Sequence, residues 1–289
     1  MQVNVEKLPK STLKITVTVT SDKVLEEFNH VLDHFVDEAE LPGFRKGNAP
    51  KKLVEEKIDQ GKLNGEVINH ILPESFRSAV SEHHIYAISS PKIMIKQFEK
   101  GKDFIYEAEV ATIPEVKIGD YKNKVKEVLS KIKKTEILGA DGKPISAKEG
   151  EKETGDDRVE VALKALNECS EVDLSPVLVN EEVERMLSRF LDQLGRLGLT
   201  IDRYLSSIGK KPEDLRAEYS EEAERNLRLE FILGKLITEE KVEVTEEEIK
   251  KAIEATPDEK TREELEKPEQ KAYIKSVLAK QKVIDKLIT

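Results

Sequence analysis

Apolar and polar residues alternate over residues 11–20, STLKITVTVT. The apolar positions are Leu13, Ile15, Val17 and Val19. Successive side chains of an extended chain point to opposite faces, so a period of two predicts a β-strand with one buried face. We therefore expect a strand here that packs against a core.

Directly after this strand, the spacing between apolar residues changes to three and four. The apolar positions of this segment are Val24, Leu25, Phe28, Val31, Leu32 and Phe35. The spacing predicts an amphipathic helix, with Ser21 as its N-cap. A loop over residues 41–50 follows, and Pro50 suits the first position of a second helix because its missing N–H costs nothing there. A third helix is expected near Leu63 to His83.

Two further segments, Ile93–Phe98 and Phe104–Val110, have the composition of strands. A glycine turn around Gly101 joins them, which is typical of a hairpin. A strand, several helices and a hairpin in this order predict an α+β domain over residues 1–115.

Beyond Val159 the strand pattern nearly vanishes, and long helical patterns replace it. The clearest apolar stripe comprises Val183, Met186, Leu187, Phe190, Leu191, Leu194 and Leu197. Glycine or proline in segments such as 195–200 and 206–215 ends one helix before the next begins. Residues 159–289 are therefore predicted to form an all-α domain of packed helices. Most apolar stripes form core, but apolar surface that stays uncovered marks a binding site for a partner.

Residues 116–158 differ from both flanking regions. They contain few large apolar residues, several glycines and dense charge, which predicts a charged linker. The Asp-Gly pair within residues 140–144 also fits the tight turn of a small hairpin, so an ordered hairpin remains an alternative.

Charge and composition exclude several classes of protein function. The chain has 289 residues, of which 38% are apolar and 37% charged, enough for two domains with real cores. Its net charge of −10 argues against a protein that coats nucleic acid. No segment approaches the roughly 20 apolar residues of a membrane span, and the N-terminus lacks the apolar run of a signal peptide. We therefore expect no membrane partner and a cytoplasmic location. The single cysteine, Cys169, is expected to serve packing.

Motifs of catalysis and of metal binding are scarce. The sequence contains no phosphate-binding loop of the Walker type and no nucleophile elbow. His30 and His34 lie four residues apart, flanked by Glu26 and Glu38, which is the spacing of metal ligands on one helix face. An exposed acidic face gives the same stripe, so we predict no metal, no cofactor and no catalytic residue.

The loop between the first two predicted helices carries the strongest signal for function. Gly43 and Gly47 bracket Phe44, Arg45 and Lys46, and their conformational freedom allows a compact projecting tip. An exposed ring beside two cations suits a surface that is part RNA phosphate and part protein. A plain helix-to-helix turn, with Phe44 folded back onto the core, is the alternative.

The segment GFRKGNAP resembles the G-F-R-x-G-x-x-P signature of the trigger factor family of bacterial ribosome-associated chaperones. The matching residues are Gly43, Phe44, Arg45, Lys46, Gly47 and Pro50. The first eight residues, the strand over 13–19 and the segment 101–122 are similar to the beginning and end of the same N-terminal domain. The helical region beyond the linker is similar, more loosely, to the family's C-terminal domain, which is elongated and has helical arms.

The resemblance implies binding without chemistry. It places the loop on the ribosome near the nascent-chain exit, against protein and rRNA, and unfolded or newly made polypeptides in a helical cradle. No nucleotide site is present, so holding and release would be independent of ATP. The expected client-binding residues are Met186, Phe190, Leu194, Leu197 and Phe231. The free protein could also form a homodimer.

Full-length trigger factors carry an FKBP-like prolyl isomerase domain between these two parts, and such a domain needs about a hundred residues. Residues 116–158 are too few, with Tyr121 as their only aromatic residue. We therefore expect a short form without isomerase activity. Two alternatives remain: a ribosome-independent holdase or assembly chaperone, and a residual peptidyl-prolyl isomerase.

Overall fold

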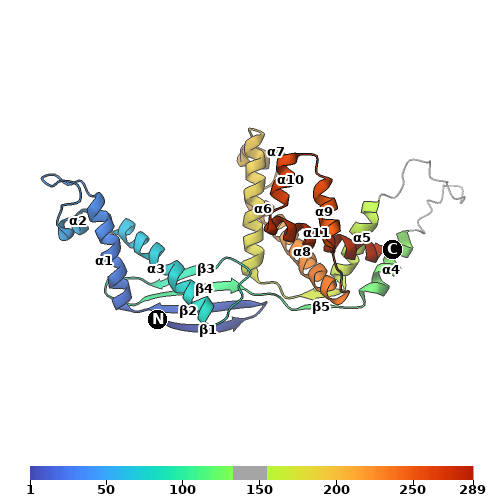
Figure 1. Ribbon diagram of the computed structural model, residues 1–289, viewed down its shortest axis with the longest axis horizontal. Helices are drawn as coiled ribbons and strands as arrows, with labels where there is room; N and C mark the ends of the chain where they lie inside the picture. The colour runs from blue at the N-terminus through green and yellow to red at the C-terminus, as the bar shows by residue number, and fades with distance from the viewer. Residues whose placement is uncertain (133–154, 289) are drawn as a thin grey trace, which may run out of the picture. The chain divides into compact units, whose positions relative to one another are not determined.

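The computed structural model describes residues 1–132 and 155–288 (Figure 1). They divide into two compact units. The first unit comprises Met1–Ile113 and Ser175–Arg185, and the second comprises Pro114–Leu174 and Met186–Thr289. None of the described helices combines the length and the hydropathy needed to cross a membrane.

A four-stranded antiparallel sheet forms one layer of the first unit. Its strands are β1 (Gln2–Leu8), β2 (Thr12–Val19), β3 (Lys92–Gln97) and β4 (Phe104–Ala111), in the order β1-β2-β4-β3. The strands predicted near the start of the chain and around the glycine turn are confirmed. Sequence analysis did not predict β1, an edge strand whose side chains are exposed or only half-buried.

Three helices of the first unit follow within Met1–Ile113: α1 (Ser21–Glu38), α2 (Lys51–Lys57) and α3 (Gln60–Glu82). Figure 1 shows α1 and α3 on the same side of the sheet. The core between sheet and helices contains, among others, Ile15, Val17, Phe28, Leu32, Leu63, Val67, Phe104 and Tyr106. The apolar positions predicted for the first helix therefore do form its buried face.

Two helix starts differ from the prediction by one residue. Thr20, and not Ser21, is the N-cap of α1, and its side chain makes no capping hydrogen bond. Instead, the backbone N–H of Ser21 donates to Asp103 Oδ1 at 2.8 Å, so a carboxylate from the β3–β4 turn satisfies the helix end. Pro50 is likewise the N-cap of α2 and not its first residue.

A buried polar pair links α3 to the sheet. Ser75 Oγ lies 2.9 Å from the hydroxyl oxygen of Tyr106, and it also donates to the carbonyl oxygen of Ile71 at 2.8 Å. Burial raises the pKa of Tyr106, because the apolar surroundings disfavour the phenolate. The ring therefore stays neutral and extends the apolar core.

The segment Ser175–Arg185 is tied to the first unit by side-chain hydrogen bonds. Thr12 Oγ1 donates to Ser175 Oγ at 2.8 Å in a buried position. Ser90 donates to both carboxylate oxygens of Glu181, through its backbone N–H at 3.0 Å and its hydroxyl at 2.8 Å.

The second unit begins with elements that the sequence analysis placed in a linker. Strand β5 (Val116–Ile118) pairs with β6 (Ser170–Val172), and α4 (Tyr121–Ile132) packs against α5 (Gly155–Glu168). The linker prediction is therefore wrong for residues 116–132. The remaining residues 133–154, including the alternative hairpin at 140–144, lie outside the described residues.

A few small contacts explain why this segment is ordered. Val125 and Leu129, four residues apart on α4, are buried against Ala162 and Ala165 of α5. Val128 packs against the same cluster, and the alanines of α5 let the two helices approach closely. Sequence analysis missed the helix because it treated residues 116–158 as one segment, in which glycines and dense charge outweigh the apolar spacing of α4.

The rest of the second unit is helical, as predicted. Its helices are α6 (Pro176–Arg196, from Met186 onward), α7 (Ile201–Ile208), α8 (Pro212–Glu239), α9 (Glu246–Glu254), α10 (Glu259–Leu265) and α11 (Pro268–Ile288). Gly209 ends α7 in the left-handed region, at φ 66°. Arg228 of α8 donates to Asn167 Oδ1 at 2.9 Å and to the carbonyl oxygen of Ser170 at 2.7 Å, which fixes α8 against α5 and β6.

Candidate functional site

Residues 39–50, here called the tip loop, connect α1 to α2 and extend away from the sheet (Figure 1). Gly43 and Gly47 have φ values of 90° and 79°, a region that side chains with a β-carbon rarely adopt. Two backbone hydrogen bonds of 3.0 Å tighten the turns, from Phe44 N–H to Leu41 and from Asn48 N–H to Arg45. Both glycines of the sequence motif therefore serve the backbone geometry.

The base of the tip loop is packed while its middle is open. Ala49 is buried with Val36 and Val54, and Leu41 packs against this cluster. Both ends of the loop are thus anchored to α1 and α2 by apolar contacts. This anchoring lowers the entropy lost when the middle of the loop binds a partner.

The middle of the tip loop presents the predicted functional side chains. Every residue from Pro42 to Lys46 is exposed, and Phe44 keeps 41% of its surface accessible. The structure thus does not support the alternative in which Phe44 folds back onto the core. Within residues 1–132 and 155–288, Arg45 and Lys46 form no ion pair, which leaves both cations available to an anionic partner.

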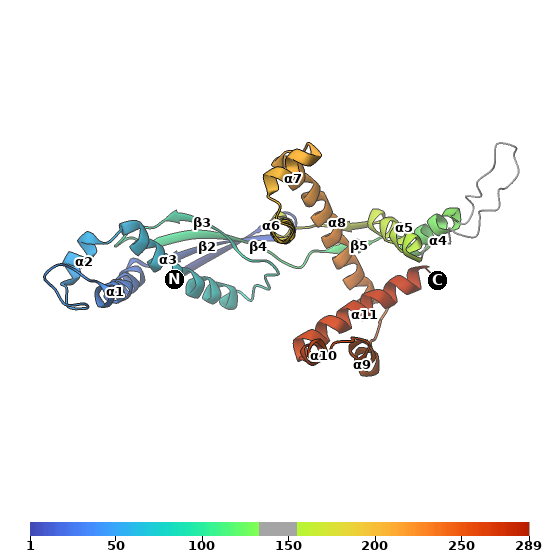
Figure 2. The same cartoon turned by 90° about the horizontal axis from the view of Figure 1, so that it is seen from above.

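The predicted client-binding residues have different surroundings. Leu194 is buried, so its prediction as a binding residue is wrong. Phe190 is half-buried, with its ring 5.0 Å from that of Tyr204 and 6.0 Å from that of Tyr219. Figure 2, which looks nearly along α6, shows α7 beside it. Phe190, Tyr204 and Tyr219 therefore pack together between α6, α7 and α8, because one face of α6 points toward both neighbouring helices.

Met186 and Phe231 are half-buried as well, and Leu197 is the exposed member of the predicted set, at 73%. Other apolar side chains of the same region are open to solvent. We group these exposed side chains under the name arm patch, which we define as Leu191, Leu197, Leu199 and Ile208. Leu199 follows Gly198 in the turn after α6, and Ile208 is the last residue of α7, directly before Gly209. The glycines that end the two helices could have pointed to both residues in the sequence.

A cavity of about 540 Å³ lies in the second unit between α4, α8 and α11. Leu129, Leu236 and Val283 form part of its apolar wall. At its rim, Glu240 accepts hydrogen bonds from Lys122 at 2.7 Å and Tyr121 at 2.8 Å.

These contacts and partial burial shift the pKa values of the groups at the rim. The hydrogen bond from Lys122 lowers the pKa of Glu240, and burial raises the pKa of Tyr121. Glu240, Lys122 and Tyr121 satisfy one another at the rim, and Tyr121 is the only aromatic residue among the described residues that line this cavity. An apolar ligand could enter.

Cys169 and the terminal histidines of α3 have structural roles. Cys169 is half-buried, and its carbonyl oxygen accepts the N–H of Gly119 at 3.0 Å. His83 is the C-cap of α3, and His84 follows it at φ 51°. The thiol of Cys169 lies 3.3 Å from the carbonyl oxygen of Leu166.

The fold has a counterpart among solved structures. A chain from the structure reported as "Promiscuous Substrate Recognition in Folding and Assembly Activities of the Trigger Factor Chaperone" matches with a TM-score of 0.61. The match covers 100% of this chain and 99% of that one, at 13% sequence identity. The fold is therefore of the trigger factor class, an α+β unit with a helical C-terminal region.

Family models agree with the fold. The model for the bacterial trigger factor protein matches residues 1–139, and the model for the bacterial trigger factor C-terminus matches residues 141–289. The chain belongs to the trigger factor family.

Curated relatives match less than half of the chain. The trigger factor of Clostridium botulinum (strain Hall) is 38% identical over 122 residues, which are 42% of this chain and 28% of that protein. The trigger factor of Streptococcus pneumoniae (strain JJA) is 36% identical over 123 residues, 43% of this chain and 29% of that one. The chain thus aligns with less than a third of either relative.

Proposed function

We propose that this protein is a cytoplasmic molecular chaperone that docks on the ribosome through its tip loop. It holds unfolded or newly made polypeptides on its helical unit, without ATP. The observation that carries the proposal is the tip loop: an exposed Phe44 and two cations without partners, on a loop whose base is packed. Membership of the trigger factor family supports the same assignment.

The chemistry of the tip loop fits a surface made of protein and RNA. The guanidinium group of Arg45 can form paired hydrogen bonds with a phosphate or a carboxylate, and Lys46 adds a second charge. The ring of Phe44 can fill a small apolar pocket at the centre of such a contact. Gly43, Gly47, Pro50 and the packed base serve to hold these three side chains in place.

The arm patch is our candidate for client binding, in place of the face that includes Leu194. Its leucines and isoleucine are exposed, whereas the neighbouring stripe of α6 is occupied by α7 and α8. Several weak apolar contacts can hold an unfolded segment by avidity. The client's own folding then removes its apolar surface, so release needs no nucleotide.

Substitution of Leu197 and Leu199 by serine is expected to weaken the suppression of aggregation by about tenfold in chaperone concentration. Loss of apolar contact on this scale is about 1.4 kcal/mol. The measurement is light scattering by a denatured client diluted into buffer without ATP. A matched control replaces the exposed Tyr86 and Ile113 of the first unit by serine. Equal suppression by the parent and the Leu197/Leu199 variant would exclude the arm patch as a client site.

We also propose that the protein has no prolyl isomerase activity. The two family models leave only residue 140 between them, whereas an isomerase domain needs about a hundred residues. A proline-containing peptide is therefore expected to isomerise at its uncatalysed rate, tens to hundreds of seconds at 25 °C. Protease-coupled turnover checks this, and catalysis by the purified chain would favour the residual isomerase alternative.

A further inference from the structure

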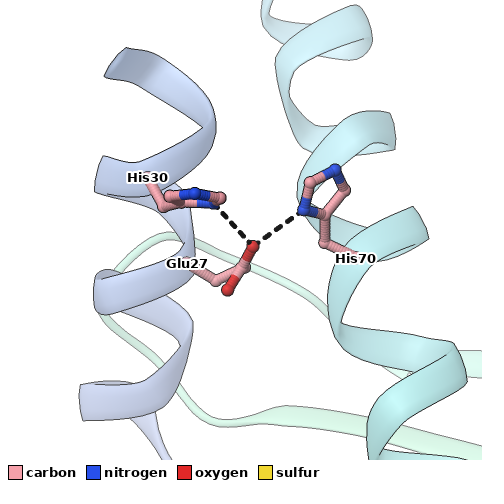
Figure 3. A group of neighbouring side chains, drawn as sticks. All are labelled: Glu27, His30 and His70. Atoms are coloured by element: carbon pink, nitrogen blue, oxygen red, sulfur yellow. Dashed lines mark hydrogen bonds and ion pairs between the residues drawn. The ribbon is translucent and has the colours of Figure 1, made fainter. Parts of the chain in front are cut away.

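Three side chains converge between α1 and α3, two helices of the first unit (Figure 3). Glu27 and His30 come from α1, and His70 comes from α3. Glu27 Oε1 lies 3.3 Å from His30 Nδ1 and 2.9 Å from His70 Nδ1. One ligand atom from each residue lies within 4.8 Å of the other two.

This set differs from the stripe seen in the sequence. That stripe is Glu26, His30, His34 and Glu38, all on one helix, and the structure brings neither glutamate of it to the convergence point. The structure adds His70, which is 40 residues away from His30 along the chain. A contact between two helices packed on a sheet holds the two imidazoles together, and the spacing along α1 does not reveal it.

We propose that Glu27, His30 and His70 bind a divalent transition-metal ion of the Zn²⁺ class. Two imidazole nitrogens and one carboxylate oxygen are ligands that Zn²⁺ accepts, at about 2.0–2.2 Å each. Tetrahedral ligands at such lengths are about 3.3 Å apart. The two distances to Glu27 Oε1 already have this scale, so an ion would replace the hydrogen bonds that now join the three groups.

The two imidazoles must come closer together to share one ion, and their exposure allows it. The side chains of His30 and His70 are 58% and 43% exposed, so rotation meets little packing. Hard cations such as Mg²⁺ prefer sets made of oxygen ligands, and the imidazoles disfavour them here.

The surroundings leave space for further ligands. A hollow of about 320 Å³ borders the site, lined on this side by His70 and His34. The ring of His34 lies 4.8 Å from that of His30, in an edge-on arrangement. Water or His34 can therefore complete the coordination, and Zn²⁺ is found in proteins with three protein ligands and a water in the fourth position.

A bound ion would join α3 to α1, the helix that leads into the tip loop. It would stabilise the first unit by mass action, because the unfolded chain lacks the convergent geometry. This inference stands on Glu27, His30 and His70 alone and does not depend on the proposed chaperone function.

The test is titration of the full-length, chelator-treated chain with Zn²⁺ by calorimetry and with Co²⁺ by visible absorption. We expect one ion per chain and a Co²⁺ spectrum of four-coordinate type. His30→Ala, His70→Ala and Glu27→Gln should each weaken binding by at least about tenfold. His83→Ala serves as the matched control, since this exposed histidine lies outside the site, and its affinity should equal that of the parent.

Thermal unfolding gives a second readout. Saturating Zn²⁺ should raise the melting temperature of the parent and of His83→Ala by about 5 °C, and leave the His30→Ala/His70→Ala double variant unchanged. Circular dichroism checks that all variants fold. Substoichiometric binding by the parent, unchanged affinity in both single histidine variants, or an equal loss in His83→Ala would overturn the proposal.

Discussion

Replacement of Phe44, Arg45 and Lys46 by alanine is expected to lower the affinity for bacterial ribosomes by at least about 100-fold. Truncation of one anchor in an interface costs about 2 kcal/mol or more, and each 1.4 kcal/mol is a factor of ten. Only Gly43 and Gly47 of this loop have positive φ values, so alanine at the three sites leaves the backbone unstrained. Co-sedimentation with ribosomes at moderate salt measures the loss.

A matched variant separates the tip loop from a general effect of charge. Tyr86, Lys7 and Lys92 of the first unit are exposed, and their replacement by alanine also removes one aromatic ring and two cations. This variant should pellet with ribosomes like the parent. If the parent itself stays in the supernatant, the protein is a ribosome-independent holdase and the tip loop serves another partner.

Substitution of Phe28 by alanine is expected to destabilise the first unit by about 3–5 kcal/mol. The ring is 1% exposed and lies in the core between α1 and the sheet, so its loss opens a cavity that the neighbours cannot fill. Its face also contacts the Lys100 ammonium, with Nζ 4.3 Å from the ring centre. Hydrogen exchange of the β2 and β4 amides in rising urea measures the stability of this unit.

The same substitution at Phe44 is the natural control. Phe44 is 41% exposed and lies outside the buried clusters of the first unit, so Phe44→Ala should change the stability by less than about 0.5 kcal/mol. A cost at Phe44 as large as that at Phe28 would mean that the ring is buried. The tip loop would then be an ordinary turn.

The sequence was sufficient for the parts of the fold that rest on strong apolar periods. The alternation ending at Val19 and the stripe from Val24 to Phe35 predicted β2 and α1 almost to the residue. The glycine-bracketed motif allowed an exposed tip, because Gly43 and Gly47 can adopt backbone conformations that other residues rarely adopt. It left open the alternative in which Phe44 folds back onto the core, and only the structure decides between the two.

Other features depend on contacts that a single segment does not contain. Helix α4 is held by Val125 and Leu129 against alanines of α5, which lie more than 30 residues later in the chain. Leu194 belongs to the same apolar stripe as Leu197, but α6 ends at Arg196, so Leu194 is buried on the helix whereas Leu197 lies in the exposed turn after it. The pairing of His70 with Glu27 and His30 crosses from one helix to another and has no signal in either.

Photo-crosslinking from position 44 tests the central claim most directly. A benzoyl-phenylalanine in place of Phe44 keeps an aromatic ring at the tip, and the same probe at exposed Tyr86 is the reference. We predict that the probe at position 44 forms crosslinks with ribosomal components beside the nascent-chain exit, and that the probe at position 86 does not. Crosslinks from position 86 alone, or none from either position while the protein pellets with ribosomes, would contradict docking through the tip loop.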